Sequence, residues 1–376
     1  MRYSECNNIL KSVFSPEVKE MIIPGSLVRI RNQLFFSEDP ETGFLNSHDL
    51  SVPENRSFSY PIFVPSDKES RNVILLLHGL NERSWLKYLA WAHFLSESTG
   101  SYVILFPISF HINRSPESWR DPRIMAQLAH DRISTSQNLQ MSSFANAALS
   151  KRLTDDPGRF LFSGYRTAVD ITNLLKSVRD GNHEIIPATS ILDIFSYSIG
   201  AFLAEIMMIA NPENLFSRTK MFVFCGGSVF SRMHGTSKLI MDSLAFNTLY
   251  KYFMDDFESS INEKNPQMKF FMNNNLGLAF RSMIDLNRLK GYREKILREM
   301  RERLSAISLV KDRVIPPAGI VETLDCFNAG RVVEVADFPY EYSHENPFPV
   351  YVNEAIIKKV DDCFDMVMAK AAEFLS

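Results

Sequence analysis

Short apolar runs alternate with longer amphipathic segments through the middle of the chain. Four runs are short and continuous enough to be strands covered on both faces: residues 72–77, 102–106, 191–195 and 220–225. After the first run, Trp85, Leu89 and Ala92 recur at helical spacing. Helices between buried strands are typical of a parallel sheet. We therefore predict an α/β protein with a mostly parallel central sheet flanked by helices.

Both ends of the chain carry further elements. Polar and apolar residues alternate over 58–64, which predicts an edge or antiparallel strand before the main sheet, followed by a polar turn at 66–70. Apolar runs at 306–310 and 331–335 predict the last two strands of the sheet. The pattern of residues 356–374 predicts a terminal helix with one apolar face.

Two segments interrupt the alternation of strand and helix. Residues 108–160 are largely polar, and Ser163 then predicts an N-cap for a helix that runs to Val178. Residues 228–303 are rich in Met, Phe and Tyr, and 285–303 reads as a solvated helix. Flexible Met and flat aromatic side chains suit an apolar acyl or aryl group, although they could equally form a small core of their own.

These interruptions suggest a division of the chain. Residues 1–70 are expected to form a lead-in with its own strands. The sheet and its helices would occupy 71–227 and 304–376, with 108–160 as a polar insertion. Residues 228–303 would form a helical lid over the carboxyl ends of the strands, where open α/β sheets bind ligands.

The sharpest local signal is Ser196-Tyr197-Ser198-Ile199-Gly200, at the end of a buried strand and the start of a helix. It resembles the pattern Gly-x-Ser-x-Gly, in which a serine on a strained strand-to-helix turn is held out as a nucleophile. The first glycine is replaced by Ser196, which is also small. We take Ser198 as the nucleophile, while an ordinary strand, turn and helix with incidental serines is the alternative.

An acid and a histidine follow later strands in the order that this motif requires. Asp312 comes directly after the strand at 306–310, and His344 lies in a loop before the terminal helix. The order Ser, Asp, His predicts a triad of Ser198, Asp312 and His344. Three other acids lie close enough to strand ends or to the histidine to compete with Asp312: Asp325, Asp337 and Glu345.

A second loop could stabilise negative charge on a substrate. His78 and Gly79 end the first buried strand, so the backbone N–H groups of Leu80 and Ile199 are candidates for an oxyanion hole. Seven residues are candidates for contact with substrate: His78, Gly79, Asn81, Tyr197, His111, Asn113 and Arg114. His78 could instead be a core histidine, and the polar residues after 108 could brace a long loop.

Composition excludes several classes of function. The chain has 376 residues and a net charge of −3 without long runs of one sign, which disfavours nucleic-acid binding. No apolar run is long enough to span a bilayer, the first residues do not resemble a secretory signal, and the four cysteines are scattered as free thiols would be. We expect a cytoplasmic protein. The motifs His-Glu-x-x-His and Gly-x-Gly-x-x-Gly are absent, so neither a metal nor a dinucleotide cofactor is expected.

Three longer stretches carry a family resemblance: residues 78–85, 106–114 and 343–347. On these stretches the chain resembles the α/β-hydrolases, and in particular an uncharacterised family of bacterial proteins with that fold. The resemblance covers most of the chain. It implies the fold and the positions of the triad, and it brings no substrate.

The combined reading is a serine hydrolase, carboxylesterase-like, that acts on a small ester-like molecule. The Ser198, His344 and Asp312 side chains would cleave a carboxylic ester or thioester through an acyl-enzyme. A peptidase or amidase would use the same triad, and a binding protein could keep the fold without reactivity. The acyl group, the leaving group and the oligomeric state are left open by the sequence.

Overall fold

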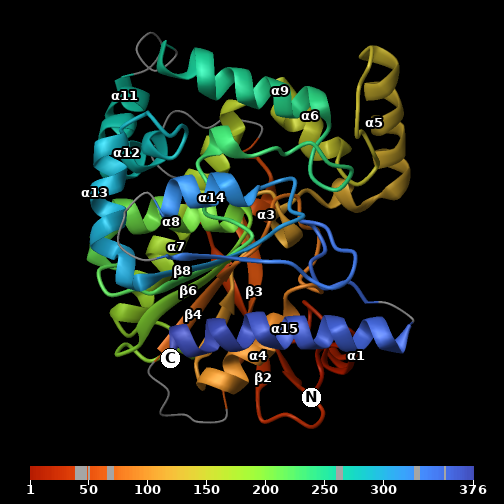
Figure 1. The fold of residues 1–376 in the computed structure, drawn as a ribbon, viewed down its shortest axis with the longest axis vertical. Helices are drawn as coiled ribbons and strands as arrows, with labels where there is room; N and C mark the ends of the chain where they lie inside the picture. The colour runs from red at the N-terminus through yellow and green to blue at the C-terminus, as the bar shows by residue number, and fades with distance from the viewer. Residues whose placement is uncertain (39–48, 50, 66–71, 260–265, 326–330, 351–352) are drawn as a thin grey trace.

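The predicted sheet forms the centre of the molecule. The computed structural model describes residues 1–38, 49, 51–65, 72–259, 266–325, 331–350 and 353–376. In these residues, nine strands form one sheet in the order β1-β2-β3-β5-β4-β6-β7-β8-β9 (Figure 1). The strands are β1 (Glu20–Ile22), β2 (Arg29–Phe36), β3 (Ser57–Val64), β4 (Asn72–Leu77), β5 (Tyr102–Leu105), β6 (Ile191–Tyr197), β7 (Met221–Phe224), β8 (Leu304–Leu309) and β9 (Val333–Ala336).

Strand direction divides the sheet into two parts. The strands β1, β2 and β3 pair antiparallel, and β3 meets β5 antiparallel with Ile62 opposite Ile104. From β5 through β4 and β6 to β9 every pair is parallel. Parallel strands bring their carboxyl ends to one edge of the sheet, so the loops that follow β4, β6 and β8 meet there. The predicted fold class, a mostly parallel sheet flanked by helices, is confirmed.

Helices connect the strands and cover the sheet. The α-helices are α1 (Tyr3–Val13), α3 (Pro53–Arg56), α4 (Leu89–Thr99), α5 (Pro122–Thr135), α6 (Ala147–Asp155), α7 (Gly158–Arg179), α8 (Ile199–Ala210), α9 (Ser243–Lys251), α11 (Pro266–Asn273), α12 (Asn275–Ser282), α13 (Lys290–Met300), α14 (Pro317–Leu324) and α15 (Glu354–Leu375). Single-turn 3₁₀ segments occur at Ile112–Arg114, Glu117–Arg120, Pro212–Asn214, Phe230–Arg232 and Arg301–Arg303, and a π-turn at Tyr252–Asp256 extends α9.

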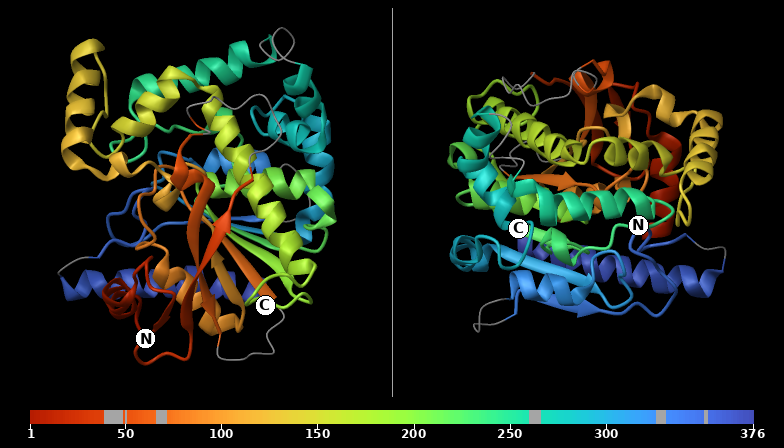
Figure 2. Two further views of the ribbon diagram at one scale, coloured as in Figure 1. Left: turned by 180° about the vertical axis from the view of Figure 1, so that it is seen from behind. Right: turned by 90° about the horizontal axis from the view of Figure 1, so that it is seen from above.

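The two faces of the sheet have separate cores. On one face α1, α4 and α15 contact one another, and Tyr3 stacks on Phe364 with ring centroids 4.2 Å apart. On the other face α7 and α8 bury Ile171, Leu174 and Met207 against the sheet. Figures 1 and 2 show α15 running across the sheet on the side away from α7 and α8. Because both faces are covered, the central strands are apolar on both sides, as their sequences predict.

The two insertions contact each other and the core. Helix α6, from the first insertion, packs against α9, from the second, and α12 packs against α8 (Figure 1). Helix α5 stands apart from the sheet at the upper right of Figure 1. The division of the chain into core and lid stays a prediction.

Two local predictions were wrong. Helix α7 begins at Gly158, whose N–H donates to a carboxylate oxygen of Asp156 over 3.0 Å, and Ser163 lies inside the helix, where its hydroxyl donates to the Arg159 carbonyl. A serine on an amphipathic segment signals a cap only when its hydroxyl does not turn back to the preceding turn. The helix expected over 285–303 is shorter, because α13 spans Lys290–Met300. The polar turn at 66–70 and Cys326 lie outside the described residues.

One carboxyl group in the core has no hydrogen-bond partner among the described residues. Glu205 on α8 is fully buried, and within the described residues neither carboxyl oxygen has a hydrogen-bond partner. Burial raises the pKa of Glu205 well above 4.5, because the charged form would lose its hydration. The folded protein therefore keeps Glu205 protonated where the unfolded chain would release the proton.

The pH dependence of stability follows from this shift. The contribution of Glu205 to the free energy of unfolding is fully present below the pKa of the unfolded chain and is lost as pH rises through the pKa of the folded protein. The Glu205→Gln variant is neutral at this position at every pH. It should therefore raise the melting temperature relative to wild type at about pH 8 and not at about pH 4. Thermal unfolding followed by circular dichroism measures this, with the exposed Glu299→Gln as control. A lower melting temperature at both pH values would show that the carboxyl group has a stabilising partner.

Candidate active site

The turn between β6 and α8 holds Ser198 in a strained backbone conformation. Its φ is 58° and its ψ is −125°, and α8 begins at the next residue. A non-glycine residue in such a conformation costs on the order of 1–3 kcal/mol, so the surrounding packing must enforce it. The predicted elbow is therefore present as a structural feature.

Close contacts around the turn explain its sequence. A Cβ added to Gly200 would lie 2.6 Å from the Leu77 carbonyl oxygen, and one added to Gly226 would lie 2.6 Å from the Cβ of Ala201. Ser196 is fully buried, and its hydroxyl donates to the Phe222 carbonyl over 3.3 Å. A serine can thus replace the first glycine of the pattern, because its hydroxyl finds an acceptor on the neighbouring strand β7.

The structure brings the three predicted side chains into one hydrogen-bonded chain. Ser198 Oγ lies 2.7 Å from His344 Nε2, and His344 Nδ1 lies 2.7 Å from Asp312 Oδ2. Each residue is only 4% exposed. If Nδ1–H donates to the carboxylate, Nε2 carries the lone pair that can accept the serine proton, as general base catalysis requires.

Backbone groups hold the acid in place. Asp312 lies in the turn after β8, and its other carboxyl oxygen accepts N–H groups from Val314 at 2.9 Å and Ile315 at 2.8 Å. Hydrogen bonds from backbone N–H groups stabilise a carboxylate and fix its orientation toward His344. Asp325 and Glu345 have other partners: Asp325 accepts from Val332 N–H, and Glu345 from the Ser237 hydroxyl.

Tyr197 holds the loop that carries His344. Its hydroxyl donates to the His344 carbonyl oxygen, and the two rings are nearly parallel with centroids 5.6 Å apart. Burial raises the pKa of Tyr197 well above 10, so the phenol remains a donor. Tyr197, predicted to bind substrate, does line the cleft beside Ser198, but its hydroxyl is used by the histidine loop.

Two backbone N–H groups near Ser198 have no partner among the described residues. Within the described residues, the N–H groups of Leu80 and Ile199 donate to no acceptor. Both residues and Ser198 line one small cavity. Unpaired N–H groups beside a serine are suited to receive an oxyanion, and the role of Leu80 and Ile199 in an oxyanion hole stays a prediction.

The loop that carries Leu80 is fixed by buried side chains. His78 is fully buried: its Nδ1 is 2.8 Å from the Gly79 carbonyl oxygen, and its Nε2 accepts the Ile108 N–H over 2.9 Å. Burial, with a smaller contribution from the nearby His111, lowers the pKa of His78 well below 6.5, so the ring is neutral. With both nitrogens occupied, His78 cannot contact substrate, so that prediction is corrected in favour of the core histidine.

Further side chains brace this loop, and sequence reasoning missed two of them. The Gly79 N–H donates to the Tyr88 hydroxyl over 3.0 Å, and that hydroxyl donates to Glu82 over 2.7 Å. Asn81 donates to the carbonyls of Ala145 and Leu239, which tie the loop to both insertions. The only sequence signal for Tyr88 and Glu82 was their place shortly after the His-Gly pair.

The polar residues after β5 divide between the site and the core. His111 lines a large apolar cavity next to Leu80 and Ile199. Asn113 donates to the Ser59 carbonyl, and Arg114 is fully buried, with Nη2 2.7 Å from Asp170. Asn113 and Arg114 therefore brace the loop, which corrects their assignment to substrate. The partner Asp170 is remote in sequence, so no local pattern could identify the pair.

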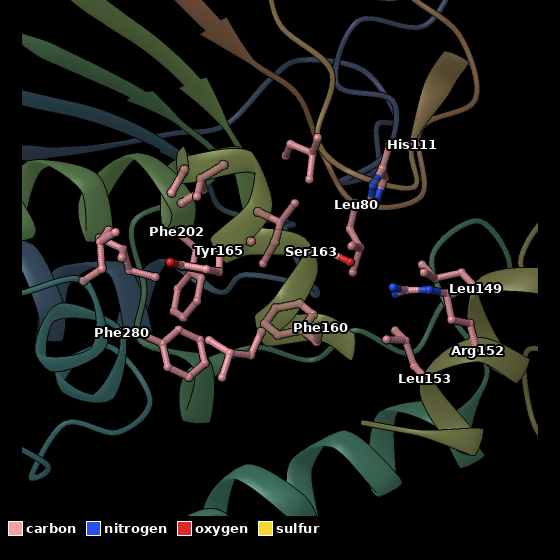
Figure 3. A pocket seen from close by; sticks show the side chains of 18 of the residues that line it. Leu80, His111, Leu149, Arg152, Leu153, Phe160, Ser163, Tyr165, Phe202 and Phe280 are labelled. Carbon is pink, nitrogen blue, oxygen red and sulfur yellow. The ribbon is translucent and has the colours of Figure 1, made fainter. Parts of the chain in front are cut away.

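Three hollows meet at Leu80, and two of them reach Ser198. The large apolar cavity, about 730 Å³ of empty space with its mouth included, lies between α6, α7, α8, α11 and α12 (Figure 3). The small apolar cavity is lined by Ser198 and by apolar side chains that include Met233, Phe246 and Ile315. The polar cleft is lined by Ser198, His344 and charged residues that include Lys87 and Glu82. Leu80 borders all three.

Neither a metal-binding cluster nor a membrane-spanning helix is found among the described residues. Among them, no group of three or more His, Cys, Asp or Glu side chains is arranged to hold a metal ion. No described helix combines the length and apolarity needed to cross a bilayer. The three described cysteines, Cys6, Cys225 and Cys363, form no disulfide among themselves.

The fold is that of the α/β-hydrolases: a mostly parallel sheet, with a serine on a turn from strand to helix and an acid and a histidine on later loops, in that order. The sequence profile of a family of unknown function (DUF6051) matches residues 3–376, and the chain belongs to this family.

Solved structures with a similar fold include three hydrolases. Carboxyl esterase 2 from the mycorrhizal fungus Tuber melanosporum is 9% identical, with a TM-score of 0.48 over 98% of this chain and 97% of the esterase. The carboxylesterase EstE1, cloned from a metagenomic library, is 10% identical, with a TM-score of 0.43 over 100% of this chain and 95% of EstE1. The acylaminoacyl peptidase of Pyrococcus horikoshii is 12% identical, with a TM-score of 0.43 over 91% of this chain and 41% of the peptidase, so this chain spans less than half of that protein's length. No relative among curated proteins matches the sequence.

Gly200→Ala tests the packing of the turn. The added Cβ would overlap the Leu77 carbonyl, so the variant should lose about 1–3 kcal/mol of stability and most of any activity that depends on Ser198. Gly291→Ala, at an exposed helical position with no atom within 4 Å of the added Cβ, is the matched control and should be neutral or slightly stabilising. Urea unfolding and initial rates measure both effects. A stable, fully active Gly200→Ala protein would contradict the close approach.

Arg114→Met separates a structural from a substrate role. Removing the guanidinium leaves the buried Asp170 carboxylate without its ion-pair partner, so the free energy of unfolding should fall by about 3–5 kcal/mol. The Michaelis constant of any remaining folded enzyme should change little, and the exposed Arg123→Met should change neither quantity. A raised Michaelis constant with unchanged stability would restore Arg114 to the substrate site.

Proposed function

We propose that the protein is a serine hydrolase that cleaves carboxylic esters or thioesters. The observation that carries the proposal is the chain of two 2.7 Å contacts from Ser198 through His344 to Asp312. Ser198 also has a strained backbone conformation, and the nearby N–H groups of Leu80 and Ile199 have no acceptor among the described residues. A nucleophile, its base, the group that orients the base and an oxyanion site are thus within reach of one another, which is the set of parts that acyl transfer requires.

The proposed reaction has two steps. His344 Nε2 accepts the proton of Ser198 as Oγ attacks the carbonyl carbon, and the Leu80 and Ile199 N–H groups bind the oxygen that becomes negative. His344 then returns the proton to the leaving group, which departs as an alcohol or thiol. Water, activated by the same histidine, releases the acid from the acyl-enzyme. Asp312 stabilises the imidazolium in both steps.

The two apolar cavities beside Leu80 and Ile199 favour an apolar acyl group. Both apolar cavities adjoin the proposed oxyanion site, since Leu80 and Ile199 line each of them. Apolar walls gain by burying an apolar group, whereas the polar cleft suits a solvated leaving group. We therefore assign the acyl part to the apolar side and the leaving group to the polar cleft. The 228–303 insertion, which supplies walls of both cavities, would act as the lid.

Substitution of the two serines tests the nucleophile. Ser198→Ala should lower kcat/KM for p-nitrophenyl esters by about four to six orders of magnitude, because the attacking atom is removed. Ser196→Ala should cost less than about a hundredfold, since its hydroxyl bonds only to a backbone carbonyl. Equal losses in the two variants would show that the wrong serine was chosen or that both act together.

A substrate panel tests the reaction class. Esters, thioesters and peptide amides that share one acyl group should be cleaved with kcat/KM highest for the esters or thioesters. An enzyme that prefers the amides would be a peptidase or amidase, and the ester assignment would be abandoned. Absence of turnover on the whole panel would favour a binding protein.

A further inference from the structure

Two polar atoms in the wall of the large apolar cavity have no partner. His111 Nε2 and Arg152 Nε are both buried, and neither has a hydrogen-bond partner among the described residues. His111 is 4% and Arg152 6% exposed, and both line the cavity. Figure 3 shows both side chains at the end of the cavity that holds Leu80 and Leu149, while Phe202 and Phe280 lie at the other. Leaving a buried polar atom unpaired is unfavourable, so a ligand that supplies its partner gains affinity.

His111 offers an acceptor. Its Nδ1 lies 2.9 Å from the Ser109 carbonyl oxygen, so Nδ1 carries the hydrogen and Nε2 carries the lone pair. Burial lowers the pKa of His111 to about 4, and the ring is therefore neutral near neutral pH. The cavity thus has a neutral acceptor at this position.

Arg152 offers a donor whose charge is already compensated. Its Nη2 donates to Asp49 over 2.7 Å, its Nη1 donates to the Arg159 carbonyl, and the guanidinium lies 3.8 Å from the centre of the Phe110 ring. Within the described residues, the N–H at Nε of Arg152 has no acceptor. Its charge also contributes to the lowered pKa of His111, so the two groups are near each other.

The neutral acceptor of His111 and the charge-compensated donor of Arg152 determine which ligand groups can pair with both. A carboxylate would present only lone pairs to the His111 nitrogen, and the Arg152 charge is already paired with Asp49. A plain alkyl group would leave both atoms unpaired. A hydroxyl both donates and accepts, and it is neutral.

We propose that the large apolar cavity binds an apolar group that carries a hydroxyl, which donates its hydrogen to His111 Nε2 and accepts from Arg152 Nε. That this group is the acyl part of the substrate rests on the proposed function. His111 and Arg152 then determine specificity, and the remainder of the cavity supplies apolar contact.

Phenol and toluene form a matched pair of ligands, because they differ by a hydroxyl in place of a methyl group. Without a partner for the hydroxyl, toluene would bind more tightly, since burying an unpaired hydroxyl costs free energy. Isothermal titration calorimetry with the wild-type protein should instead give a Kd for phenol that is lower by about tenfold or more. A Kd for toluene equal to or lower than that of phenol overturns the proposal, and the two atoms are then satisfied by water.

Variants assign the preference to His111. His111→Phe keeps an aromatic ring and removes the acceptor, so the ratio of the two Kd values should fall by about tenfold. His130→Phe, at an exposed position on α5, should leave the ratio as in wild type. A ratio unchanged in a folded His111→Phe protein overturns the assignment, and the wild-type comparison decides the proposal if that variant does not fold.

Paired esters connect the cavity to turnover. The p-nitrophenyl esters of para-hydroxyphenylacetic and para-methylphenylacetic acid differ by the same exchange, and kcat/KM should favour the hydroxylated ester by about tenfold. If phenol is preferred and neither ester is cleaved, the hydroxyl site stands and the proposed function fails. If both esters are cleaved alike and toluene binds as well as phenol, the proposed function stands and the hydroxyl site fails.

Discussion

The close approach of backbones where β4, β6 and β7 end is the constraint on which the site depends. Gly200 lies against the last carbonyls of β4, and Gly226 lies against the first turn of α8. Side chains at these positions would push the turn away from the sheet. With glycine there, the packing of α8 against the sheet can hold Ser198 at a positive φ, and the free energy of the surrounding core offsets that strain.

The other parts of the site are placed by the same edge of the sheet. The Leu80 loop follows β4 and the Asp312 turn follows β8, while the His344 loop comes after β9 and is held by Tyr197 of β6. Each loop is tied down by buried hydrogen bonds rather than by its own sequence, as His78 and Asp312 show. Such buried hydrogen bonds can preorganise the serine and the histidine at hydrogen-bonding distance.

Sequence patterns were informative where function depends on local geometry. The strand-to-helix signal at Ser198 and the positions of Asp312 and His344 after later strands could be read from period and order alone. The roles of His78 and Arg114 could not, because a polar residue near a strand end looks the same whether it faces substrate or a buried partner. Arg114 pairs with Asp170, which lies on α7 and far along the chain. The start of α7 depends on a hydrogen bond to Asp156, and the cavity walls depend on contacts between the two insertions. A local sequence pattern contains neither of these interactions.

The proposed function depends on Ser198 being a nucleophile that His344 makes reactive. Labelling with a fluorophosphonate, which traps an activated serine covalently, followed by mass spectrometry of the digested protein, tests it most directly. We expect a single adduct on Ser198 that forms in wild type and is lost in His344→Ala. An adduct on another residue, or no adduct in folded wild-type protein, would contradict it.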